Sequence, residues 1–190
     1  MIPNLAESGY LPVGRYLASA REVEERFATN ERRVDLWNSL KKVMDLLEAA
    51  LGEKPHIWLS GSFLSSKEQP GDLDIVVLID NTAMSRLSRF GLYIIDTVGR
   101  NLLRENFGLE IDSFILEVDS PIDASSPLDE YLLLKANGQL DAGGIQRDSD
   151  EEYYLYRRGY WDNLWSATRD KQGRLVPCSR GYLEVMADAS

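Results

Sequence analysis

The sequence predicts an α+β protein, and three observations lead to that class. Short apolar runs typical of strands lie at residues 57–59, 75–79 and 109–118. Between them lie stretches whose apolar residues recur at helical spacing, in an order that favours a mixed sheet covered mainly on one face by helices. The 190 residues, 44% hydrophobic and 27% charged, suffice for one globular domain with a real core.

Composition narrows the functional classes. No apolar run is long enough to span a bilayer, and the N-terminus lacks a basic region followed by an apolar one, so we expect a cytoplasmic protein without membrane partners. The single cysteine, Cys178, can form neither an internal disulfide nor a cysteine metal cluster. The formal net charge of −10 disfavours extended nucleic-acid binding. Only local clusters are basic: Arg32–Arg33, Lys41–Lys42, Arg86 with Arg89, and Arg157–Arg158.

The first third of the chain contains clear helix signals. Residues 1–19 hold Pro and Gly among apolar residues and are expected to wrap the surface without regular structure. Ser19 and Glu22 predict a capping box that starts a short helix over 20–27. A long helix is expected over about 32–51, after the start signal at residues 29–30 and before a stop at Gly52.

The later elements are expected as one more helix and a strand. Asn81 and Thr82 predict the start of a helix that runs to about residue 105, and Gly108 lies beyond its end. The buried face of this helix is expected to hold Leu87, Phe90, Ile94, Ile95, Val98 and Leu102. The alternating run 109–118 predicts a strand. Further on, a short helix is expected over 128–136, a loop over 137–150, and a hairpin turn at residues 171–173 that leads into a second strand at 181–186.

The candidate site lies in the stretch 56–80, HIWLSGSFLSSKEQPGDLDIVVLID. Asp72 and Asp74 head an apolar strand and project on the same side of it, because side chains alternate along a strand. Two adjacent carboxylates repel each other, and a divalent cation such as Mg²⁺ would offset that repulsion. The alternative is a turn whose solvated aspartates simply precede the strand.

Gly61 and Ser62 sit between the two strands of this stretch. Glycine permits close approach of a ligand to the backbone, and Ser62 with the amides after it forms a candidate anion cradle at a helix start. Lys67, in the loop that follows, either reaches a triphosphate oxygen or is solvated. His56, the single histidine, is expected to be a strand-end residue.

These residues carry a resemblance. Gly61–Ser62, followed about ten residues later by Asp72 and Asp74, resembles the polymerase-β-type nucleotidyltransferase superfamily. More narrowly, SGSFLSSKEQPGDLDIVVLID resembles a small bacterial and phage nucleotidyltransferase-like family, as do residues 2–4, 11–12 and 23–30. The resemblance covers about the first two thirds of the chain. It implies a nucleotidyltransferase-type sheet, an NTP substrate, and Mg²⁺ (or Mn²⁺) held by Asp72 and Asp74.

The resemblance also implies a third carboxylate on the next strand. Asp112 matches by position, and a charge inside an otherwise apolar strand is costly without a function. Glu110 shares its face and is the alternative. The implied catalytic and metal-binding set is Asp72, Asp74 and Asp112, and the implied nucleotide-binding set is Gly61, Ser62 and Lys67.

The acceptor stays open: a protein, a tRNA end or a small molecule, in a toxin–antitoxin or phage-defence setting. The other class of function is a non-catalytic, antitoxin-like module that binds nucleotide or a partner. We divide the chain into a nucleotidyltransferase-like core, residues 1–120, and a C-terminal extension, residues 121–190, packed on it. The aromatic and arginine-rich segment 153–169 is predicted to dock the acceptor, the alternative being that its aromatic residues cover the sheet.

Overall fold

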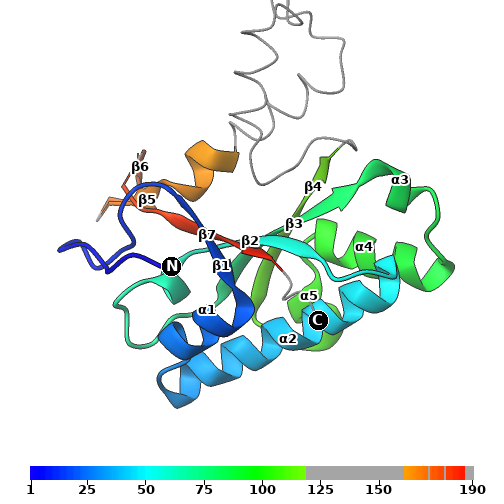
Figure 1. The fold of residues 1–190 in the computed structure, drawn as a ribbon, viewed down its shortest axis with the longest axis horizontal. Coiled ribbons are helices and arrows are strands. Elements are labelled where there is room, and N and C mark those ends of the chain that lie inside the picture. The colour runs from blue at the N-terminus through cyan, green and yellow to red at the C-terminus, as the bar shows by residue number, and fades with distance from the viewer. Residues whose placement is uncertain (119–160, 171, 178, 187–190) are drawn as a thin grey trace, which may run out of the picture.

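A five-stranded mixed sheet is the centre of the computed structural model, which describes residues 1–118, 161–170, 172–177 and 179–186 (Figure 1). Its strand order is β1-β7-β2-β3-β4. The pairs β1–β7 and β3–β4 are parallel, whereas β7–β2 and β2–β3 are antiparallel. The strands are β1 (Arg15–Ser19), β2 (His56–Ser60), β3 (Leu73–Asp80), β4 (Ile111–Val118) and β7 (Tyr182–Met186).

Helices cover one face of this sheet, which confirms the predicted α+β class (Figure 1). Side chains at alternate positions of the strands, such as Ile75 and Val77, pack there against apolar residues of the helices. The covering helices are α1 (Ala20–Phe27), α2 (Glu31–Leu51), α4 (Arg89–Gly99) and α5 (Leu103–Phe107). The four-residue α3 (Asn81–Met84) follows β3, and the 3₁₀ turn η1 (Ser62–Leu64) follows β2.

The opposite face has a smaller core. Trp58 and Val76 lie there with Leu116, and the helical turn at 161–165 (orange in Figure 1) covers them with Trp161 and Trp165. A small hairpin, β5 (Thr168–Arg169) with β6 (Leu175–Val176), follows that turn. None of the helices in the described ranges is both long and apolar enough to cross a membrane.

Local signals predicted the helix ends correctly. Ser19 and Glu22 form the capping box of α1, with the Ser19 amide donating to the Glu22 carboxylate at 2.9 Å. The Asn30 side chain accepts from the Arg33 amide at the start of α2. Gly52 and Gly108 end α2 and α5 in the left-handed conformation.

Two predicted elements and the burial of one residue were wrong. The N-terminal segment is not entirely irregular, since β1 is an edge strand of the sheet. The single helix expected over 82–105 is three helices, because Ser88 caps a new helix that starts at Arg89, its hydroxyl accepting from the Gly91 amide, and Asn101 takes a positive φ of 56° before α5. Phe90, expected to be buried, is 48% exposed.

The predicted C-terminal strand is present as β7, but its pairing was predicted wrongly. The turn near Gly173 forms a hairpin as predicted, but its second strand is β6 rather than residues 181–186. Those later residues form β7, which inserts between β1 and β2. The end of the chain therefore completes the central sheet, and a boundary at residue 120 does not separate this sheet from an extension. The helix and loop predicted within 121–150 lie outside the described residues.

A buried carboxylate fastens β7 to its neighbours. Glu184, 2% exposed, lies with Oε2 3.1 Å from Arg15 Nε on β1 and Oε1 2.9 Å from His56 Nε2 on β2. A buried carboxylate needs such partners to offset its lost hydration. His56 is a strand-end residue, as expected, and its imidazole lies beside this carboxylate.

Candidate functional site

The three predicted carboxylates lie on one face of the sheet. Asp74 on β3 is in register with Asp112 on the parallel strand β4, so their side chains project on the same side. Asp72 lies one residue before β3 and is close enough to raise the pKa of Asp74. The shared face is the one that also carries Val76 and Leu116, opposite the main helical layer.

Asp74 is the electrostatic centre of this group. Burial and the negative charge of Asp72, in that order, raise its pKa to about 6, with a smaller contribution from Asp112. Arg180 opposes the shift. A carboxylate in such surroundings is costly to ionise without a cation, and hard oxygen ligands are those that Mg²⁺ prefers. The donor chemistry of the three side chains therefore fits the implied metal.

The described residues nevertheless contain no group of three or more His, Cys, Asp or Glu side chains gathered tightly enough to hold a metal ion as they stand. The carboxylates share a face and influence one another, but they are not a closed cage. Metal binding stays a prediction for these residues.

Gly61 explains how Asp74 is accommodated. Its backbone takes φ 84° and ψ −165°, a conformation that is essentially restricted to glycine. A Cβ built on Gly61 would stand 1.6 Å from Oδ2 of Asp74. The carboxylate therefore lies directly against the backbone of the turn, and Ser62 begins η1 immediately beyond it. The structure brings together these two parts of the predicted motif.

Arg33 of α2 holds this turn from the helical side. Its guanidinium, 4% exposed, donates to the carbonyls of Phe27 and Phe63 at 3.2 and 2.7 Å. It also donates to those of Ser65 and Lys67 at 2.7 and 2.6 Å. Three of these four bonds fix the path of the chain directly after Ser62, and the fourth ties the end of α1 to it.

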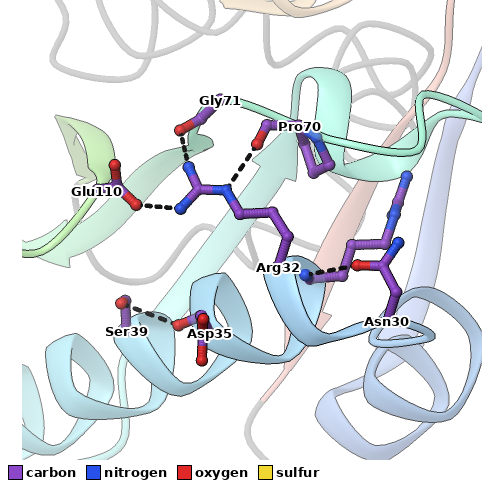
Figure 2. A network of polar contacts seen from close by, with 8 residues as sticks. Asn30, Arg32, Asp35, Ser39, Pro70, Gly71 and Glu110 are labelled. Atoms are coloured by element: carbon purple, nitrogen blue, oxygen red, sulfur yellow. Dashed lines mark hydrogen bonds and ion pairs between the residues drawn. The ribbon is translucent and has the colours of Figure 1, made fainter.

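Arg32 holds the other end of the same loop (Figure 2). It donates to the carbonyls of Pro70 and Gly71, immediately before Asp72, and forms an ion pair with Glu110. The pair Arg32–Arg33, one of the local basic clusters of the sequence, is therefore a loop anchor. Glu110 is engaged with α2, so the structure favours Asp112 over Glu110 as the third carboxylate near Asp74.

The structure supports the positions of two predicted nucleotide-binding residues, Ser62 and Lys67, less directly than that of Gly61. Ser62 is half-buried, but η1 is only three residues long, so the helix start expected there is a short turn. Lys67 is exposed, and its described contacts fix its backbone rather than its amino group. Their roles toward a nucleotide stay predictions.

Sequence reasoning missed two residues beside the carboxylates. Ser60, buried and in register with Asp74, donates from Oγ to the carbonyl of Trp165 at 3.3 Å. Arg180 donates from Nε to that same carbonyl at 3.0 Å and senses the charge of Asp74. No local signal marks Arg180, because 106 residues separate it from Asp74 and only the insertion of β7 brings it near.

The aromatic residues of segment 153–169 are only partly described. Trp161 and Trp165 are buried, 8% and 4% exposed, and pack against Phe114 with ring centroids 5.1 and 5.7 Å away. They cover the sheet, so the prediction of an open docking platform is wrong for these two. Arg169, also predicted to dock the acceptor, is exposed on β5 and donates to the carbonyl of Gly173 at 2.9 Å. The remaining predicted docking residues lie outside the described residues: Tyr153, Tyr154, Tyr156, Arg157, Arg158 and Tyr160.

Comparison with protein families assigns the chain. It belongs to DUF6932, a family of unknown function, whose model matches residues 3–186. The match spans both the carboxylate-bearing strands and β7. No curated protein and no solved structure matches the chain.

Proposed function

We propose that this protein is a metal-dependent nucleotidyltransferase that moves a nucleoside monophosphate from an NTP to an acceptor hydroxyl. One observation carries the proposal. Asp74, with a pKa raised to about 6, lies between the charges of Asp72 and Asp112 and directly against the turn Gly61–Ser62. Folding alone gives no reason to gather three acids at that turn, whereas a cation with a polyphosphate does.

The reaction proposed is an in-line substitution at the α-phosphate. The acceptor oxygen forms a bond to the α-phosphorus, the bond from that phosphorus to the bridging oxygen breaks, and pyrophosphate leaves with the electron pair. Asp112 orients the acceptor hydroxyl and takes its proton. Ser62, the neighbouring amides and Lys67 hold the β- and γ-phosphates.

Mg²⁺ or Mn²⁺, when bound by Asp72, Asp74 and Asp112, supplies positive charge for the phosphates and lowers the pKa of the attacking hydroxyl. The residues themselves position the two reactants, and this restriction in freedom accounts for much of the rate of such transfers. The use of NTPs is consistent with the cytoplasmic location that we propose.

A non-catalytic module that binds nucleotide or a partner is the second candidate. The observation in its favour is that the described carboxylates do not form a closed metal-ligand group. Such a module would bind an NTP and release it intact. The acceptor of an active enzyme is a protein, a tRNA end or a small molecule, and the net charge of −10 favours the first and third over an extended nucleic acid.

Position-specific labels separate the two candidates. The protein is incubated with Mg²⁺, each NTP labelled at either the α- or the γ-phosphate, and separate protein, tRNA and small-molecule acceptor fractions. Nucleotidyl transfer leaves the α-label on the acceptor and releases the γ-label as pyrophosphate. Transfer of the γ-label would identify a kinase instead. If binding occurs without transfer to any fraction, the non-catalytic module is favoured.

A further inference from the structure

Arg180 is a charged side chain beside the carboxylates for which the sequence motifs provide no role. It is half-buried, and burial lowers its pKa while the charge of Asp74 partly offsets that effect. Its Nε and the hydroxyl of Ser60 donate to one oxygen, the carbonyl of Trp165, at 3.0 and 3.3 Å. Because Ser60 is the cross-strand partner of Asp74, this shared acceptor places Arg180 at the edge of the candidate site.

The backbone around Arg180 is fixed on both sides. The amides of Ser179 and Arg180 both donate to the carbonyl of Ser166, at 2.8 and 3.0 Å. The next amide, of Gly181, donates to the carbonyl of Leu11 at 2.9 Å. A Cβ at Gly181 would stand 2.1 Å from the oxygen of Pro12, so the chain passes this point in close contact with the N-terminal segment. A side chain held this firmly by its backbone is preorganised.

The guanidinium retains binding capacity. An arginine has five N–H donors, and among the described residues only Nε has an acceptor. Asp74 is near enough to act on Arg180 electrostatically, yet the two are not in contact as an ion pair in the part of the chain that the structure describes. Holding one carbonyl would not require an arginine, whose planar fork is suited to a phosphate or a carboxylate.

We propose that Arg180 binds the phosphates of the nucleotide at the carboxylate site and competes electrostatically with the metal when no nucleotide is bound. The inference rests on the proposed function, of which it names one further positioning residue. The consequence is that replacing Arg180 shifts the affinity for the metal and the affinity for the NTP in opposite directions. Without Arg180, the cation alone faces less positive charge, whereas the triphosphate loses a partner.

The test compares Arg180→Gln with Arg174→Gln, which removes the same charge from the exposed hairpin ion pair Arg174–Asp170. Calorimetry measures the affinity of each protein for Mn²⁺ alone. It then measures, with Mg²⁺ present, the affinity for an NTP and for the corresponding nucleoside. For Arg180→Gln we expect Mn²⁺ to bind at least about threefold more tightly, since a nearby like charge has been removed. NTP affinity should fall at least about tenfold with nucleoside affinity unchanged. Arg174→Gln should change none of these.

Several results would overturn the inference. Unchanged NTP affinity in a folded Arg180→Gln protein would do so, as would a parallel loss of Mn²⁺, nucleoside and NTP binding, which indicates a purely structural role. If Arg180→Gln does not fold, Arg180→Met keeps the apolar stem without the charge, and wild-type NTP affinity in that variant would exclude the proposed contact. If the wild-type protein binds neither Mn²⁺ nor an NTP, the proposed function itself fails, and this inference fails with it.

Discussion

The two faces of the central sheet are made by the same strands but have opposite character. Along β3, Ile75, Val77 and Ile79 point into the core beneath the helices. Asp74 and Val76 lie on the opposite face of the same strand. Arg33, a buried arginine on the helical side, donates its hydrogen bonds to main-chain carbonyls. The acids on the opposite face repel one another instead. The helical face is explained by folding, and the acid-bearing face calls for a ligand.

The largest expected effect concerns the helical face. Arg33→Leu would remove the guanidinium donor from the buried carbonyls of Phe63 and Ser65 and from the part-buried carbonyl of Lys67, and each such loss costs about 1–3 kcal/mol before the site relaxes. We expect the free energy of unfolding to fall by at least about 3 kcal/mol, measured by urea denaturation. Arg21→Leu, which removes an exposed pair with Glu25, should change it by no more than about 0.5 kcal/mol. Equal effects of the two variants would contradict the anchoring role of Arg33.

The next effect concerns the chemistry of the opposite face. Asp112→Asn should lower the transfer rate at least about a hundredfold, since it removes the proposed proton acceptor. NTP affinity should stay within about tenfold of the wild-type value. Single-turnover transfer and equilibrium binding measure the two quantities separately. Glu110→Gln is the matched control, and a slow Glu110→Gln with a normal Asp112→Asn would reverse the assignment.

The third effect is on stability and depends on pH. The pKa of Asp74 in the folded protein, about 6, exceeds the ordinary value of 3.8 for an aspartate. This group therefore favours the folded state below pH 4, and its contribution is lost as the pH rises through 6. The loss is at most roughly 3 kcal/mol, and Asp74→Asn should escape it because asparagine carries no charge.

Urea denaturation with a chelator at pH 5 and pH 7.5 measures this difference. At pH 7.5 we expect Asp74→Asn to be more stable than the wild-type protein by about 1–3 kcal/mol, with a smaller gain at pH 5. Asp96→Asn, on the exposed side of α4, serves as the control. A variant Asp74→Asn that is less stable at pH 7.5 would show that the charge of Asp74 is already compensated within the protein.

The sequence predicted what local signals encode. Ser19, Asn30 and Gly52 set helix ends through contacts within a few residues, and the alternation along β3 placed Asp72 and Asp74 on one side. Ser88 is a local start signal as well, but the continuous helical spacing of apolar residues around it predicts one long helix. The insertion of β7 between β1 and β2, and with it the position of Arg180, depends on pairing across more than 100 residues, which no local pattern reveals.

The most direct test of the carboxylate site is calorimetry of Mn²⁺ and of Mg²⁺ with an NTP, on the wild-type protein and on Asp72→Ala, Asp74→Asn and Asp96→Asn. The account predicts that the wild type and Asp96→Asn bind both, and that the Asp72 and Asp74 variants stay folded but lose metal-dependent nucleotide binding at least about thirtyfold, roughly 2 kcal/mol. Unchanged metal and NTP affinity in folded Asp74→Asn would contradict the assignment of this face as the site.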